Sequence, residues 1–144
     1  MKLIFSSLSY TNLLFLLLLC SLPGCMGNGG EPTPDLGEVT GTITLDGTPL
    51  GKANVIFEPE AVGEKGRSRA SSAITSADGQ FKLAFNSDVS GASIGKHKVI
   101  ISKMSDNPAE AGLQLVPTKY NDASELTADV VAGSNTINFD LKSK

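Results

Sequence analysis

Few residues in this sequence are suited to covalent chemistry, and two cysteines are the most reactive of them. Cys20 and Cys25 are the only cysteines, and they lie in the N-terminal stretch LLFLLLLCSLPGCMGNGG, residues 13–30. Such a pair could form a disulfide, provide a thiol site, or lie outside the folded protein altogether. Which of these possibilities applies to Cys20 and Cys25 has to be inferred from the sequence around them.

The single histidine limits acid–base chemistry. His97 is the only histidine, and it stands between Lys96 and Lys98 in a strand-like segment. A lone histidine could act as an acid or base, but this setting favours a structural strand residue. The serines are numerous, yet none has a recognisable histidine or lysine partner that would activate it. We therefore predict no catalytic residues and no enzymatic activity.

Calcium is the one metal that the sequence leaves open. Oxygen ligands could converge from six aspartates that fall largely in predicted turns: Asp46, Asp78, Asp88, Asp106, Asp122 and Asp129. No loop has the dense D-x-D-x-D pattern, and the preference of aspartate for turns explains these positions. We therefore expect no metal and no cofactor.

The length and net charge of the chain limit the number of domains and the kinds of partner. The chain has 144 residues, which suits one domain, and a net charge of −3. It has no basic block, so the electrostatic pattern expected for nucleic-acid binding is missing. We expect no nucleic-acid partner.

The N-terminal segment is typical of an export signal. Lys2 supplies one positive charge, residues 3–24 contain no charged side chain, and residues 13–19 are apolar throughout. A bilayer-spanning helix needs about 20 apolar residues, whereas polar residues dilute positions 6–12 and Pro23-Gly24 closes the other end. A removable signal is therefore favoured over a permanent transmembrane helix.

The end of this segment, Leu22-Pro23-Gly24-Cys25, resembles the lipobox of bacterial lipoproteins. The resemblance implies cleavage after Gly24, a diacylglycerol thioether on Cys25, and an acylated new N-terminus. Three acyl chains would make attachment effectively permanent, since one chain alone binds a membrane only marginally. The alternative is an ordinary secretory signal in which the cysteine is incidental.

The residues after Cys25 read as a tether. The sequence MGNGGEPTPDLGE is rich in Gly, Pro and small polar residues, as flexible linkers are. In lipoproteins an aspartate after the lipidated cysteine favours the inner membrane, and Met26 stands here instead. The resemblance thus implies an outer-membrane location, or the cell membrane if the cell has only one. We predict a signal peptide over 1–24, a lipidated linker over 25–37 and one domain over 38–144.

The domain has the period-two alternation of β-strands. Val39, Gly41, Ile43 and Leu45 share one face of the first strand, whereas threonines 40, 42 and 44 share the other. Further strands are expected over 52–59, 69–75, 79–85, 95–102, 125–131 and 135–142, separated by turns such as Asp46-Gly47 and Asp78-Gly79. This spacing predicts a single all-β, antiparallel Greek-key β-sandwich of about seven strands.

Several details of the sandwich can be predicted as well. Phe57, Phe81, Phe85 and Phe139 should fill the space between the sheets. The weaker strand over 69–75 should place Ala70, Ser72 and Ile74 inward. Ile56 and Ile100 fall on outward faces and could mark a contact surface. Residues 104–124 should contain an edge segment around 113–120, or cover one end of the sandwich.

Four segments together resemble bacterial lipoproteins with a carboxypeptidase-regulatory-like domain. They are GTITLDGTPLGKANVIFEP, TSADGQFKL, GKHKVIIS and VPTKYNDASELTADVVAGSNTINFDL, and the match covers nearly all of residues 38–142. The resemblance implies a transthyretin-like Greek-key sandwich. It does not extend to transthyretin-like hydrolases, because those enzymes use several histidines and a C-terminal tetrapeptide ending in serine, which this chain lacks.

Two functions follow as hypotheses. The first is a lipid-anchored sandwich with a non-catalytic structural, adhesion or protein-binding role at the cell envelope. The second is an accessory module that binds a small ligand or a carbohydrate, with a polar surface near His97, Tyr120 and the 104–124 segment. We expect the membrane as one partner, with envelope proteins or glycans as others.

Overall fold

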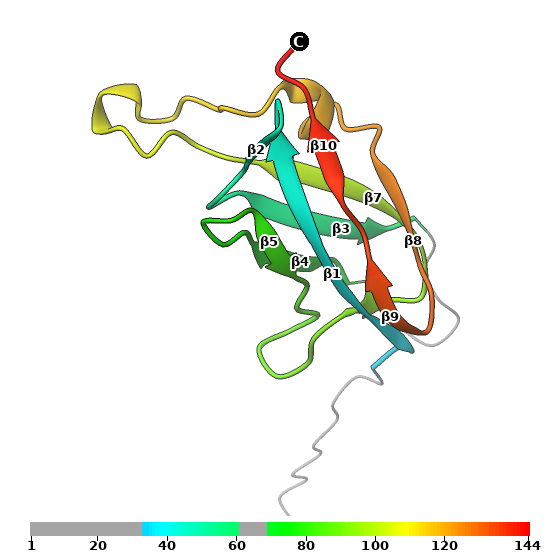
Figure 1. The fold of residues 1–144 in the computed structure, drawn as a ribbon. Coiled ribbons are helices and arrows are strands. Elements are labelled where there is room, and N and C mark those ends of the chain that lie inside the picture. The colour runs from blue at the N-terminus through cyan, green and yellow to red at the C-terminus, as the bar shows by residue number, and fades with distance from the viewer. Residues whose placement is uncertain (1–32, 61–68) are drawn as a thin grey trace, which may run out of the picture. The chain divides into compact units, whose positions relative to one another are not determined.

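The computed structural model describes residues 33–60 and 69–144 (Figure 1). The predicted signal peptide, the lipobox residues Leu22, Pro23 and Gly24, both cysteines and most of the linker lie outside the described residues. Residues Glu31–Lys144 form one compact unit.

The domain is all-β, and its strands form two sheets that pack as a sandwich (Figure 1). The predicted all-β sandwich is therefore confirmed, although two of its strand pairings are parallel. In chain order the elements are β1 (Leu36–Leu45), β2 (Thr48–Pro49), β3 (Asn54–Pro59), β4 (Ser71–Ile74), β5 (Gln80–Lys82), β6 (Ala92–Ser93), β7 (Gly95–Ser102), the 3-10 helices η2 (Pro108–Glu110) and η3 (Thr118–Tyr120), β8 (Thr127–Val130), β9 (Gly133–Thr136) and β10 (Phe139–Leu141).

Strand β1 is the centre of the first sheet. Strands β2, β5 and β6 pair with it antiparallel, whereas β9 and β10 pair with it parallel. Thr40 is opposite both Lys82 of β5 and Thr136 of β9, so the two groups of strands flank β1 on opposite sides. The parallel pairs arise because β8 belongs to the other sheet. After β8 the chain crosses to the first sheet, where its next strand, β9, pairs with β1.

The second sheet is antiparallel throughout, in the order β4-β3-β7-β8. Ile56 and Ile100 lie directly opposite each other on β3 and β7, half-buried on the outward face as predicted.

The predicted facing of β4 is wrong. Ser71 is buried and Ala73 partly buried, while Ile74 is 73% exposed. The register with β3 places Ser71 opposite the buried Phe57, and this pairing decides which face turns inward. The sequence RASSAIT does not indicate which face turns inward, because its small residues differ little in hydrophobicity. A shift of one residue then exchanges the two faces of the strand.

Aromatic side chains fill the space between the sheets. Phe57, Phe81 and Phe139 belong to this core, as predicted, whereas Phe85 is buried outside the core cluster. The ring of Phe57 lies at the centre, with ring centroids 6.4 Å from Phe81 and 6.2 Å from Phe139. Aromatic pairs at this separation add to the stabilisation from buried area.

The predicted Asp46-Gly47 turn closes the β1–β2 hairpin. Both residues have positive φ, 52° and 81°, the combination that a two-residue type I′ hairpin turn requires. Asp-Gly is a favoured pair there, since Gly adopts positive φ without steric cost.

Gly41 allows the chain between β9 and β10 to cross close to β1. A Cβ atom at Gly41 would lie 1.7 Å from the carbonyl oxygen of Ile137. The side chain of Asn138 then replaces a backbone partner, because its Oδ1 accepts from the Thr42 N–H at 2.9 Å. A bend thus separates the two parallel pairings on this side of β1.

Residues 103–116 form a hairpin arm that projects from the sandwich (Figure 1, yellow). Met104 bridges to Gln114, and the Leu115 N–H donates to the Lys103 carbonyl at 2.8 Å. The chain returns to the core at Val116, which is 1% exposed. The predicted edge segment around 113–120 is therefore a returning hairpin strand followed by a turn that packs on the core.

Candidate functional site

His97 does not lie on the surface where the ligand hypothesis requires it. Its side chain points inward from β7 and is 1% exposed, with its ring 5.8 Å from that of Phe57. Nδ1 is 3.0 Å from the Gly95 carbonyl oxygen, and Nε2 is 3.2 Å from the Ser93 hydroxyl. Burial lowers the pKa of His97, because an apolar surrounding disfavours the charged imidazolium.

Tyr120 makes structural contacts within the domain. The residue is half-buried and packs against the core, and its hydroxyl accepts from the Lys142 N–H at 3.0 Å. The Lys119 ammonium lies 5.1 Å from the ring centroid, within cation–π range. His97 and Tyr120 thus have separate sets of partners, and the structure does not bring them together in one hollow.

The turn aspartates do not gather into a cation site in the described part of the chain. Within residues 33–60 and 69–144 no group of three or more His, Cys, Asp or Glu side chains could hold a metal. Asp46 instead accepts from the Ser143 N–H, and hydrogen bonding to the side chain and then the backbone of Ser143 lowers the pKa of its carboxyl. Asp106 pairs with Lys52 at 3.3 Å.

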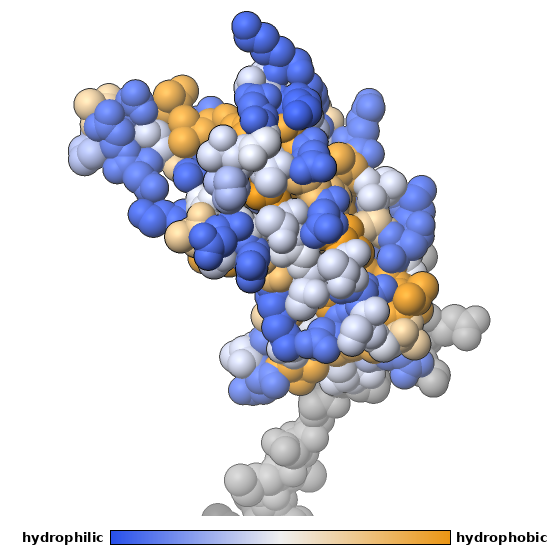
Figure 2. All heavy atoms as spheres, in the orientation of Figure 1, coloured by the Kyte–Doolittle hydropathy of each residue, from blue (hydrophilic) through white to orange (hydrophobic). Residues whose placement is uncertain are grey.

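An open hollow of about 660 Å³ crosses the outward face of the first sheet. It runs over four neighbouring segments: the end of β4, strand β5, the middle of β1, and the bend between β9 and β10. The residues that line it are Thr40, Gly41, Thr42, Ile74, Thr75, Ser76, Gln80, Phe81, Lys82, Thr136 and Asn138. This face is turned to the viewer in Figure 2, where pale and blue residues cover its middle.

Strand alternation puts these polar groups on one face. Thr40 and Thr42 point outward from β1, while their neighbours Val39 and Ile43 are fully buried. Gln80 and Lys82 flank the buried Phe81 on β5 in the same way. Successive side chains of a strand point to opposite faces, so burial of one set exposes the other.

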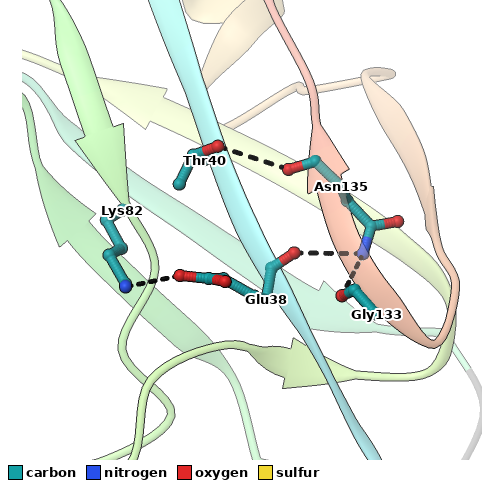
Figure 3. A network of polar contacts seen from close by, with 5 residues as sticks. All are labelled: Glu38, Thr40, Lys82, Gly133 and Asn135. Carbon is teal, nitrogen blue, oxygen red and sulfur yellow. Dashed lines mark hydrogen bonds and ion pairs between the residues drawn. The ribbon is translucent and has the colours of Figure 1, made fainter.

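One charged pair lies at the rim of the hollow. Lys82 donates to the Glu38 carboxylate across β5 and β1 (Figure 3). The Lys82 hydrogen bond and charge lower the pKa of Glu38, so this carboxyl stays ionised at neutral pH. The pair cancels its own net charge and leaves the hollow lined mainly by neutral polar groups.

Asn135 fixes the strand that forms the far wall. Its Nδ2 donates to the Glu38 carbonyl at 3.0 Å and the Gly133 carbonyl at 3.3 Å (Figure 3). Two further bonds join its amide to the backbone of Val131, as Nδ2 donates to the carbonyl at 2.8 Å and Oδ1 accepts from the N–H at 3.0 Å. This buried amide holds β9 in register against β1.

The lining residues were missed as a site at the level of sequence. The alternation of threonines at 40, 42 and 44 was visible, and by itself it indicates an outward strand face. The sequence does not indicate which strands lie on either side of β1, because β5 and β9 come from distant parts of the chain.

Among the described residues no helix has the length and apolar character needed to cross a membrane.

Comparison with known proteins gives no assignment. No protein-family model matches the chain, and no curated protein matches it in sequence. A crystal structure of a DUF3823 family protein from Parabacteroides merdae is similar, with a TM-score of 0.40 and 13% sequence identity over 75% of this chain. The match covers 46% of that protein, so the chain spans about half its length. The likeness is weak.

Proposed function

We propose that the protein is an exported lipoprotein whose β-sandwich has a non-catalytic structural, adhesion or protein-binding role at the bacterial cell envelope. The observation that carries the proposal is the sequence of residues 13–25, an apolar leucine-rich run that ends in Leu22-Pro23-Gly24-Cys25. Cleavage after Gly24 would remove Cys20 with the signal and leave Cys25 as the lipidated first residue.

The chain length after Cys25 suits a tethered domain. Strand β1 begins at Leu36, so residues 26–35 separate the proposed lipid from the first strand. Ten extended residues span at most about 35 Å. Such a tether would let the sandwich stand clear of the head groups while three acyl chains hold it in place.

The domain itself supports a role in binding rather than in catalysis. Its sequence elements resemble carboxypeptidase-regulatory-like domains, and we include membership of that group in the proposal. The one histidine is enclosed in the core, where it is out of reach of a substrate at the surface. A second candidate function, an accessory module for a carbohydrate or small ligand, is favoured by the polar hollow on the first sheet.

Fatty-acid labelling in a bacterial host tests the anchor. Cells expressing the wild type, Cys25→Ser or Cys20→Ser are fed an alkyne-tagged palmitate, and membrane and soluble fractions are compared. We expect the wild type and Cys20→Ser to be labelled and membrane-bound at the processed size. Cys25→Ser should be unlabelled and unprocessed, because a serine offers no thiol for the thioether.

Cys20→Ser is the matched control, since it changes the neighbouring cysteine and leaves the lipobox intact. Labelling of Cys25→Ser at the wild-type level would overturn the proposed anchor. If only Cys20→Ser lost the label, the lipid would be on Cys20 and not on Cys25. That result would overturn the proposed anchor equally.

A further inference from the structure

The hollow on the first sheet contains hydrogen-bonding groups that the fold does not use. In the described part of the chain, the side chains of Gln80, Thr42 and Thr136 have no hydrogen-bond partner. Asn138 is exposed and uses Oδ1 to accept from the Thr42 N–H, while its Nδ2 has no hydrogen-bond partner among the described residues. The groups include both donors and acceptors, and they come from β1, β5 and the β9–β10 bend.

The charge of the hollow selects against ionic ligands. Lys82 is the one cation among its lining residues, and the Glu38 carboxylate neutralises it. A phosphate or a carboxylate would find no free positive charge there. A cation would find no free carboxylate among the lining residues.

The shape selects for an extended ligand with apolar and polar faces. The hollow is open and crosses several strands, so it fits a chain lying on the surface better than an enclosed small molecule. Ile74, at 73% exposure, adds an apolar side chain at one end. A sugar ring has the matching features, because it carries hydroxyl groups at its edge and C–H groups on its faces.

We infer that this hollow binds a segment of a neutral oligosaccharide chain. The unused amide and hydroxyl groups of Gln80, Thr42, Thr136 and Asn138 would bond the sugar hydroxyls, and Ile74 would contact a ring face. The inference rests on the proposed binding role and adds a ligand class and a place on the fold.

An extended peptide is the less favoured ligand. Peptides that add to a sheet do so at a free strand edge, where backbone groups are unpaired. This hollow lies over the face of the sheet, with β1 paired on both sides. Recognition here must therefore come from side chains.

Titration of the isotope-labelled full-length protein followed by NMR tests the inference. The protein is kept in a detergent without a sugar head group, and maltohexaose, cellohexaose and N-acetylchitohexaose are added separately. We expect at least one of them to shift the side-chain amide signals of Gln80 and Asn138 in a saturable way. An oligogalacturonate and a Gly-Ser-Thr peptide serve as anionic and peptide probes.

Two variants locate the site. Gln80→Ala and Thr136→Val change exposed side chains, and each should weaken binding about threefold to tenfold, the effect of one lost hydrogen bond. Thr127→Val is the matched control, because Thr127 is an exposed threonine on β8 of the other sheet. Its affinity should stay within about twofold of the wild type.

Absence of any shift with all three neutral oligosaccharides at about 5 mM, where a complex with a Kd of about 1 mM would be mostly formed, would overturn the inference. Binding of the peptide or the anionic probe alone would do the same, as would equal weakening by Thr127→Val. The titration does not depend on lipidation, so its failure leaves the labelling result at Cys25 unaffected, and the reverse also holds.

Discussion

At the scale of single residues, His97 shows how strand alternation decides between a site and the core. Val99 and Ile101 are fully buried on β7, and His97 continues the same inward set. The period of two therefore contained the signal that this histidine turns inward. Lys96 and Lys98 beside it lie on the other face of the strand.

The placement of His97 predicts a pH dependence of stability. In the unfolded chain an imidazole takes up its proton near pH 6.5, whereas burial lowers the pKa of His97 in the fold. The hydrogen bond to the Gly95 backbone and the charges of Asp129 and Glu60 oppose this only in part. Between the two pKa values the unfolded chain binds more protons, so folding is weakened as the pH falls. The stabilisation should be complete above pH 6.5 and lost progressively below it.

Urea unfolding at about pH 7.5 and about pH 5.5, on either side of the ordinary histidine pKa, measures this effect. The free energy of unfolding of the wild type should be higher at the upper pH, and His97→Phe should remove most of the difference. Glu38 and Asp46 have pKa values lowered from 4.5 and 3.8, so their contributions are lost at lower pH. An equal pH dependence in wild type and variant would show that another group is responsible.

At the scale of elements, the individual strands were predictable and some of their partners were not. Alternation located β1, β3, β5 and β7 because each places large apolar side chains on one face. It could not reveal that β9 and β10 lie parallel to β1, since this depends on where the chain crosses between the sheets. The hollow combines four segments, several of them distant in the sequence, and for that reason it could not be predicted from the sequence.

The crossover itself depends on Asn135. Replacing Asn135 with alanine should lower the free energy of unfolding by about 2–3 kcal/mol, because it leaves backbone groups of Val131 and Glu38 without partners near the core. Asn54→Ala is the matched control, since Asn54 is exposed on β3 and should change stability by less than about 0.5 kcal/mol. Chemical denaturation compares the two.

Equal stability of Asn135→Ala and Asn54→Ala would contradict the role given to this amide. If Asn135 also positions the far wall of the hollow, Asn135→Ala should alter the amide signal of Asn138 in the folded protein, whereas Asn54→Ala should leave it in place.

At the scale of the whole molecule, the two sheets differ in what they offer to a partner. The outward face of the first sheet carries an open polar hollow. That of the second carries the isoleucine pair of β3 and β7 among charged neighbours. Strand β1 runs from the N-terminal end of the domain to the end where β2, β10 and the hairpin arm lie (Figure 1).

The intact mass of the protein isolated from its own cells tests the central claim most directly. The account predicts a mass equal to residues 25–144 plus a diacylglyceryl group and an acyl chain, with fragment ions that place the added mass on Cys25. An unmodified mature chain that begins at another residue, or a protein that retains residues 1–24, would contradict the lipid anchor.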